Sequence, residues 1–378
     1  MTIKHSRAAW QRKAMDEVSV SSSPAAFEFL TLTLYEVTAS PHFAAWLHDA
    51  EISIAFSNSD HLYMVGLKAD GALAISRTKF TRCMGLARAG NSTLYLATEY
   101  QIWRLENGVP PGQRTENGCD ALYLPQSAYT TGHLGIYDLA VDAQGQIIFA
   151  NTLLSCLATV SDKYNFVPLW LPPFVPNLAA VDHCHLNGLA MRDGKPAYVT
   201  SAGQTSGDKS WQKTKRDGGV ITDVARNQVV VEGLAMPHSP RWYRDSLWLT
   251  NSGTGEFGRA DFKRGRFEPM VFAPGFLRGL DFVGRYAIIG SSYTGSNELY
   301  EGLPLENVLR EKQLRARHGL YIVDLETGEL AHWLYFDGLS RELYSVAALP
   351  GVRHPMSVES DGEEIQELVT VGTGRNAT

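Results

Sequence analysis

The sequence has few cysteines, no long apolar run and no excess of basic residues, and each absence excludes a class of protein. Its four cysteines (Cys83, Cys119, Cys156 and Cys184) form neither a CxxC pair nor a disulfide framework. No run approaches the roughly 18 apolar residues that a membrane span requires, and the first residues lack the apolar core of a secretory signal. These features predict a cytoplasmic protein with reduced thiols and no membrane contact.

The charge balance is slightly acidic, with 34 Lys and Arg against 40 Asp and Glu and a formal net charge of −6. A nucleic-acid-binding surface needs clustered basic residues, whereas the basic residues here are scattered along the chain. We therefore expect no nucleic-acid partner, and we expect a small-molecule or peptide substrate instead.

Short β-branched and aromatic runs, separated by Gly, Asp and Asn, fill the chain from Glu51 onward, which is typical of antiparallel sheet. The runs group into units of roughly fifty residues, the spacing of propeller blades. We predict an all-β fold, a six-bladed β-propeller over residues 51–350, with a partly helical N-terminal extension (1–50) and a C-terminal tail (351–378). Within the extension, Ser40 and Pro41 predict a short helix that runs to Leu47. A β-sandwich and a seven-bladed ring are the alternatives.

The two ends of the propeller are predicted to share one blade. Residues 61–67 match residues 319–325 as the third strand of a blade, so residues 52–57 are a second strand whose blade lacks a first. Residues 343–349 supply that first strand, and the closed ring leaves no open sheet edge.

A polar stretch, Asp182-His183-Cys184-His185-Leu186-Asn187, stands just before a predicted inner strand. Inner strands line the channel of a propeller, so the residues that precede them in all blades meet at one mouth. The positions equivalent to Asn187 are Met84, Tyr137, Ser239, Arg278 and Tyr344, and Arg82 and Glu342 stand two residues before the first and last of these. So many polar groups predict a ligand or metal site, with a solvated channel lining as the alternative.

The histidines of this mouth are chemically suited to a transition metal, because neutral imidazole binds Zn, Fe or Cu. In an extended strand His183 and His185 would face the same side and reach one ion. The predicted metal ligands are His183, His185, Asn187 and His238. The metal is divalent, with Ca, Zn, Fe and Cu all open, and histidines with a purely structural role are the alternative.

Other polar residues receive substrate-binding and catalytic roles. A guanidinium group fixes a carboxylate or phosphate, and the predicted substrate-binding residues are Arg82, Ser239, Arg241 and Arg278. Tyr137, Tyr344 and Glu342 are the predicted acid–base groups. The segment 291–318, which includes a helix-like run at 305–316, is predicted to cover the site.

Two further features are interpreted as structural. Strand alternation would turn Cys184 into the blade, so a buried, inert thiol is favoured over a Cys–His nucleophile. The serines form no GxSxG motif, so a serine hydrolase is not supported. The polar turn 251–256 follows a second strand, and we expect it at the opposite mouth, where it would serve hairpin formation alone.

Four motifs carry a family resemblance: HLNGLA (185–190), PHSPRW (237–242), NSGTGE (251–256) and PGFLRGL (274–280). They resemble an uncharacterised family of bacterial β-propeller proteins over most of residues 50–355. More distantly, Asn187-Gly188-Leu189-Ala190 resembles the metal-dependent gluconolactonase and regucalcin group of six-bladed propellers. That resemblance implies that Asn187 binds a divalent metal. The group's metal-binding aspartate falls at Ser239, and histidine ligands in its place would favour a softer metal.

These features predict a metal-dependent enzyme that acts at the channel mouth on a small anionic or peptide-like substrate. Hydrolysis of a lactone or ester is the default chemistry, because a bound divalent ion lowers the pKa of water towards neutrality. An Fe or Cu ion would indicate redox chemistry instead. The alternative is a non-catalytic propeller that binds a protein or a small ligand.

Overall fold

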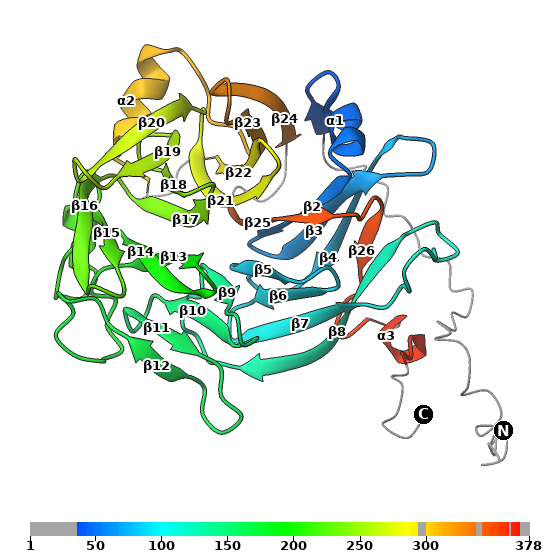
Figure 1. Ribbon diagram of the computed structural model, residues 1–378, viewed down its shortest axis with the longest axis horizontal. Helices are drawn as coiled ribbons and strands as arrows, with labels where there is room; N and C mark the ends of the chain where they lie inside the picture. Colours follow the sequence, from blue (N-terminus) through cyan, green and yellow to red (C-terminus); the bar gives the residue numbers. More distant parts are fainter. Residues whose placement is uncertain (1–35, 294–299, 338–341, 363, 371–378) are drawn as a thin grey trace.

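The computed structural model describes residues 36–293, 300–337, 342–362 and 364–370. They form six sheets arranged around a central channel (Figure 1). The predicted six-bladed propeller is confirmed, and the alternative sandwich and seven-bladed ring are excluded.

From the channel outwards, the blades contain β25 (Leu343–Pro350), β2 (Ile52–Asn58), β3 (His61–Leu67) and β4 (Leu73–Lys79); β5 (Leu86–Ala89), β6 (Thr93–Ala97), β7 (Gln101–Asn107) and β8 (Ala121–Thr130); β9 (Leu139–Val141), β10 (Ile147–Asn151), β11 (Cys156–Thr159) and β12 (Val167–Trp170); β13 (Leu186–Arg192), β14 (Lys195–Ser201), β15 (Gly219–Asp223) and β16 (Gln228–Leu234); β17 (Pro237–Tyr243), β18 (Ser246–Asn251), β19 (Glu256–Asp261) and β20 (Arg266–Phe272); β21 (Phe276–Val283), β22 (Tyr286–Ser292), β23 (Gly319–Asp324) and β24 (Glu329–Asp337).

Burial explains the sequence of the second strand in each blade. Both faces of this strand pack against neighbouring blades, so it consists of an unbroken run of buried residues, as in β10 with Ile147-Ile148-Phe149-Ala150-Asn151. The outer edge strand of the same blade, β12, is largely exposed. The alternation of apolar and polar residues that marks a half-buried strand is therefore absent from the inner part of each blade.

Ring closure follows the prediction. The strand β25 pairs antiparallel with β2, from Ile52 opposite Pro350 to Asn58 opposite Leu343. A core cluster that includes Phe56, Tyr63 and Phe336 fills the space between this blade and its neighbour.

Buried hydroxyl groups link successive blades at the mouth. In four blades, a Ser or Thr at the end of the second strand donates a hydrogen bond to a backbone carbonyl near the start of the next inner strand. The pairs are Ser57 with Met84, Thr152 with Leu186 (2.6 Å), Ser252 with Leu277 (2.5 Å) and Ser292 with Leu343 (3.1 Å). We call these contacts the inter-blade latches; they fix the height at which each inner strand begins.

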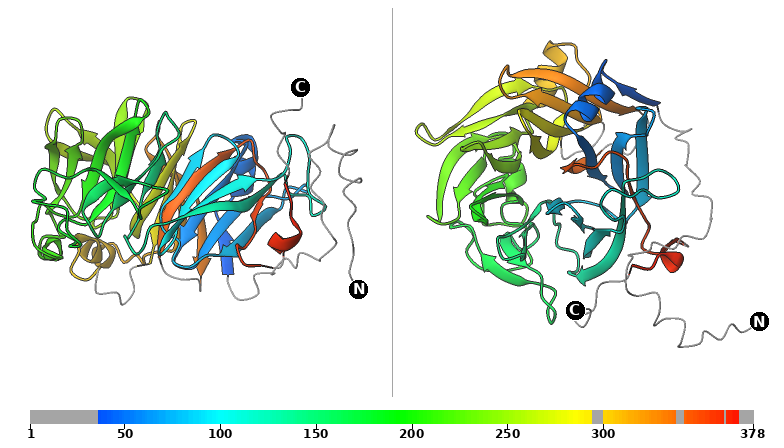
Figure 2. Two further views of the ribbon diagram at one scale, coloured as in Figure 1. Left: turned by 90° about the horizontal axis from the view of Figure 1, so that it is seen from below. Right: turned by 45° about the vertical axis from the view of Figure 1, so that its right-hand side comes forward.

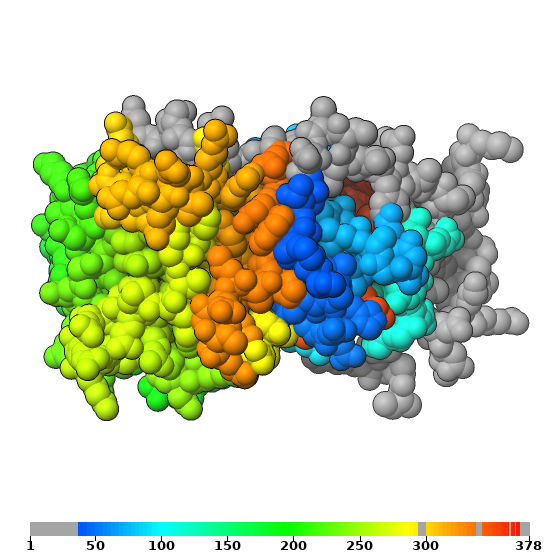
Figure 3. All heavy atoms as spheres, turned by 90° about the horizontal axis from the view of Figure 1, so that it is seen from above, coloured from blue at the N-terminus to red at the C-terminus, as the bar shows by residue number. Residues whose placement is uncertain are grey.

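Both ends of the chain add strands to the propeller. β1 (Glu36–Ala39) pairs with β24 as a fifth strand, and β26 (Pro355–Ser357) pairs in parallel with β8. The predicted short helix is present as α1 (Phe43–Asp49), with His42 rather than Ser40 at its N-cap. Figure 3 shows the blue N-terminal segment against the orange blade. α3 (Glu364–Glu367) follows β26, and the first 35 residues lie outside the described residues.

Two insertions lie on one face of the propeller. The first, 202–218, contains the 3-10 helix η2 (Ser210–Lys213), and the second contains α2 (Pro304–Glu311), seen at one flat face of the disc in the left view of Figure 2. A shared cluster of buried residues joins them: Ala202, Trp211, Met236, Phe276, Tyr300, Leu303 and Leu305. The helix α2 is shorter than the predicted 305–316, and residues 294–299 of the predicted covering segment lie outside the described residues. Among the described helices, none is long and apolar enough to cross a membrane.

The position predicted for the polar turn 251–256 is wrong. Asn251 pairs with Pro237 at the start of β17, and the Leu305 amide donates to the Gly253 carbonyl at 2.7 Å. In an antiparallel blade the second strand returns to the side where the first began. The turn therefore lies at the same mouth as the predicted site.

The inter-blade latch between Ser292 and Leu343 is expected to stabilise the closed ring. The Ser292 hydroxyl is fully buried; it donates to the Leu343 carbonyl and accepts from the Leu343 amide at 2.9 Å. Ser292→Ala leaves both backbone groups unpaired, so we expect the free energy of unfolding to fall by about 1–3 kcal/mol. Urea denaturation measures it, with Ser127→Ala, which removes an exposed hydroxyl, as the control. Equal stability of the two variants would contradict a role for the latch.

Candidate functional site at the channel mouth

A ring of aromatic and ionisable side chains stands at the mouth where the inner strands begin. Its neighbours in contact are His185 and Tyr137 (centroids 5.5 Å apart), Tyr137 and Tyr344 (5.8 Å), and His238 and Phe276 (5.4 Å). Arg278 lies between Tyr344 and Phe276. These residues come from four different blades, and we call the set the mouth ring.

His185 is oriented by a carboxylate. Asp182 Oδ2 accepts from His185 Nδ1 at 3.0 Å and from Trp211 Nε1 at 3.0 Å, while Asp182 Oδ1 accepts from the His185 amide at 2.7 Å. The indole of Trp211 also stacks on the imidazole, with centroids 4.2 Å apart. Because Nδ1 donates to the carboxylate, the neutral ring carries its lone pair on Nε2.

The backbone at His185 is left-handed, with φ 52°, and the equivalent residues of two preceding blades share this conformation: Gly135 (φ 65°) and Arg82 (φ 49°). The turn therefore belongs to the fold. A non-glycine residue in the left-handed region costs free energy, so the imidazole at this position has a role that glycine cannot fill.

The predicted geometry of the metal ligands is wrong in one respect. His183 and His185 do not lie in an extended strand, because β13 begins only at Leu186. His183 Nδ1 hydrogen-bonds to the Ser206 carbonyl at 2.6 Å, and its buried Nε2 has no partner among the described residues. Asn187 Oδ1 accepts from Thr200 at 2.8 Å.

The predicted ligand set therefore does not fit an ion held by three such side chains. Within the part of the chain that the structure describes, no three His, Cys, Asp or Glu side chains are arranged to hold a metal. The metal stays a prediction, and no step below passes through it.

His238 is a buried, uncharged imidazole. Its Nδ1 donates to the Met236 carbonyl at 2.8 Å and lies 3.1 Å from the Ser252 hydroxyl. Burial, reinforced by the positive charge of Arg278 and by His185, lowers the pKa of His238 well below its usual value. Its lone pair is therefore on Nε2, which has no partner among the residues described.

Arg278 is a buried cation held among aromatic rings. Its side chain is 3% exposed, and Cζ lies 4.8 Å from the ring centroid of Phe276, 5.2 Å from Tyr344, 5.8 Å from Tyr300 and 6.0 Å from Tyr137. Burial opposes its charge, but Tyr300 and Glu342 outweigh burial and raise the pKa of Arg278. No described residue accepts a hydrogen bond from its guanidinium, and Nε is buried without a partner.

Glu342 is fixed by two phenols. The Tyr300 hydroxyl donates to Glu342 Oε1 at 2.9 Å, and the Tyr344 hydroxyl donates to Oε2. Burial raises the pKa of Tyr344, and it also raises the pKa of Tyr137, against the opposing effect of Arg278 in both cases. Both phenols are therefore protonated at neutral pH and are hydrogen-bond donors.

The other predicted substrate-binding residues are engaged elsewhere. Arg241 binds Asp138 with two hydrogen bonds, Nη1 to Oδ2 at 2.7 Å and Nη2 to Oδ1 at 2.9 Å, and so links two blades across the channel. The Ser239 hydroxyl accepts from the Gly279 amide at 2.9 Å. Arg82 is exposed and pairs with Glu99 at 3.3 Å.

Sequence reasoning missed three residues of the site. Asp182 was part of the polar stretch but received no role, although an Asp three residues before a His is typical of a side chain that caps a turn. Trp211 and Tyr300 lie in the two insertions, where no blade repeat indicates their position. Their only signal is that large aromatic residues occur in otherwise polar inserted segments.

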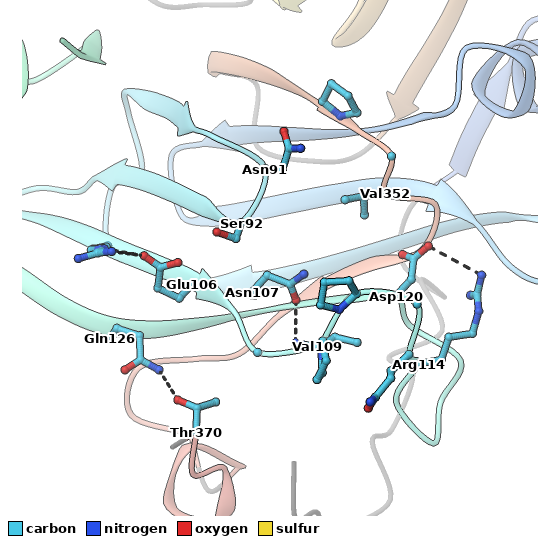
Figure 4. A pocket seen from close by; sticks show the side chains of 18 residues that line it. Asn91, Ser92, Glu106, Asn107, Val109, Arg114, Asp120, Gln126, Val352 and Thr370 are labelled. Carbon is cyan, nitrogen blue, oxygen red and sulfur yellow. Dashed lines mark hydrogen bonds and ion pairs between the residues drawn. The ribbon is translucent and has the colours of Figure 1, made fainter. Parts of the chain in front are cut away.

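A hollow of about 950 Å³ beside β7 and β8 is a separate feature (Figure 4). Its charged groups are paired, Arg104 with Glu106 at 2.6 Å and Arg114 with Asp120 at 3.8 Å. It shares no residue with the mouth ring, and it presents no unpaired buried charge, so it is the weaker candidate for a site.

The thiol of Cys184 is expected to be unreactive. It packs in a core cluster with Ile148 and Leu186, and burial raises its pKa to about 12. We expect no alkylation of Cys184 by iodoacetamide at pH 8 in the folded protein and rapid alkylation in urea, measured by mass spectrometry. Alkylation at equal rates in both states would reopen the Cys–His nucleophile.

The metal prediction has a direct test. If the predicted site exists, purified protein carries one equivalent of Ca, Zn, Fe or Cu by elemental mass spectrometry, and His185→Ala loses it. Protein that holds no ion and takes up none on addition would contradict the prediction and leave the chemistry of the side chains untouched.

Comparisons with known proteins place the fold and the family. No curated protein sequence matches the chain. One chain of a nidogen/laminin complex is similar with a TM-score of 0.50 and 11% identity, over 79% of this chain and 99% of that one. A luciferin-regenerating enzyme has a TM-score of 0.44 and 11% identity, over 81% of this chain and 90% of its own. A gluconolactonase from Xanthomonas campestris has a TM-score of 0.43 and 12% identity, over 81% of this chain and 88% of its own.

These likenesses concern the fold alone, and they agree with the distant resemblance to gluconolactonases predicted from the motifs. The family described as "Domain of unknown function (DUF4915)" matches residues 41–358, a span that includes every residue of the mouth ring. The chain therefore belongs to the DUF4915 family of β-propellers.

Proposed function

We propose that the mouth is the active site of an enzyme that acts on a small anionic substrate, with hydrolysis of an ester or lactone as its chemistry. The observation that carries the proposal is Arg278, which is 3% exposed and has no acceptor for its guanidinium among the described residues. A buried charge without a partner is costly. An anionic ligand that accepts from the guanidinium would remove this cost.

His185 would act as the general base. Its Nδ1 is held by Asp182, which leaves Nε2 to accept a proton, an arrangement that recurs in enzymes that use histidine in this way. In the proposed step, Nε2 takes a proton from water as the water oxygen forms a bond to the acyl carbon. The acyl–oxygen bond then breaks, and the proton passes to the leaving alkoxide, which gives an acid and an alcohol.

The phenols would stabilise the charge that develops on the acyl oxygen. Tyr137 contacts the rings of both His185 and Tyr344, and its hydroxyl has no partner among the described residues. Because burial raises its pKa, it remains a donor at neutral pH. Glu342 would hold Tyr300 and Tyr344 in place and balance the charge of Arg278.

Two variants test the proposal on a panel of carboxylate-bearing esters and lactones. Asp182→Asn removes the carboxylate that orients His185, and we expect kcat to fall by roughly 10²- to 10⁴-fold. Arg278→Met removes the anion partner while it keeps an apolar chain of similar length, and we expect KM to rise for anionic substrates while neutral esters are unaffected.

Arg88→Met is the matched control, because Arg88 is exposed and lies with the cavity at the far end of the channel. If all three variants keep wild-type activity, the mouth is not the active site. If Arg278→Met abolishes anion binding but no turnover is found on any substrate, the protein is a non-catalytic ligand-binding propeller, the alternative predicted from the sequence.

A further inference from the structure

A second group at the mouth constrains the ligand beyond its charge. His238 and Arg278 both lie on the ring of Phe276, with the imidazole centroid at 5.4 Å and the guanidinium carbon at 4.8 Å from the Phe276 centroid. One small molecule can therefore reach both side chains. The two present opposite hydrogen-bonding characters, because guanidinium only donates and the imidazole Nε2 accepts.

The acceptor character of His238 is fixed by its surroundings. Nδ1 donates to the Met236 carbonyl, which cannot donate in return, so this nitrogen must carry the proton. The groups that face the imidazole are the cation of Arg278 and the imidazole of His185, and both disfavour a second proton. The ring is 3% exposed, so an unused lone pair would be left without water in a largely desolvated place.

The charge of the mouth favours a carboxylate over a phosphate. Arg278 is the buried cation of the mouth ring, while Arg82 is exposed and already paired with Glu99. Asp182 and Glu342 place two carboxylates at the same mouth. A singly charged carboxylate matches one guanidinium, whereas a phosphate dianion would meet an excess of negative charge.

We infer that the ligand of this mouth is a small hydroxy acid, whose carboxylate binds Arg278 and whose hydroxyl donates to Nε2 of His238. The inference rests on the proposed function, since it names the substrate class of the same site. The ester or lactone that is hydrolysed would carry both groups, and the acid itself would bind without reacting.

The test compares lactate with propionate, two monoanions of similar size that differ by one hydroxyl group. Their dissociation constants are measured by NMR titration of the purified full-length protein, so that binding is separated from turnover. We expect lactate to bind about fivefold more tightly than propionate, the factor that one hydrogen bond of ordinary strength provides. Inorganic phosphate is expected to bind more weakly than either acid.

His238→Phe keeps an aromatic ring but removes the acceptor, and we expect it to abolish the preference while propionate binds as before. Circular dichroism confirms that the variant is folded, and the wild-type comparison decides the matter even if it is not. Equal wild-type affinities for lactate and propionate would overturn the inference and leave the anion site of Arg278 intact. If neither acid binds wild-type protein, the anion site fails, and the proposed function fails with it.

Discussion

Backbone pairing between β25 and β2 is the constraint on which the rest of the structure depends. A channel with a mouth exists only if the ring closes, and this pair joins the two ends of the propeller in one blade (Figure 1). Closure also completes the site, because Glu342 and Tyr344 stand at the start of β25. Only in the closed ring do they meet Arg278, which belongs to the adjacent blade.

The inter-blade latches transmit this constraint to the mouth. Each latch ties the end of a second strand to the beginning of the next inner strand, so the residues that precede the inner strands are held at one level. The left-handed turn at His185 then directs a short polar stretch across that level rather than along a strand. Asp182 can hydrogen-bond His185 because the turn brings a residue three positions earlier back towards the imidazole.

Burial gives the mouth its chemical character. The two insertions bring Trp211 and Tyr300 over the ring and remove water from it. In such surroundings hydrogen bonds and charges interact more strongly than in water, and an unpaired polar group is correspondingly costly. The same burial keeps His238 uncharged and keeps the phenols protonated, so the mouth offers fixed donors and fixed acceptors at neutral pH.

The blade repeat was readable from the sequence, because strand periodicity and turn residues are local properties. Strands expected at 197–201 and 220–224 lie at Lys195–Ser201 and Gly219–Asp223. The shared blade was also predictable, since residues 343–349 resemble other inner strands. The alignment of blades further identified Arg278, Tyr137 and Tyr344 as residues of one mouth, because equivalent positions in a ring must lie at equal height.

The sequence by itself therefore determined the fold and the level at which the site lies. Only the tertiary structure decided which side chains meet and in what state. It engaged Arg241 with Asp138, left Arg278 without an acceptor among the described residues, and placed Trp211 and Tyr300, which no repeat locates. Hydrogen-bond partners, burial and backbone handedness depend on neighbours from other blades and from the insertions, and a local pattern of residues carries no record of those neighbours.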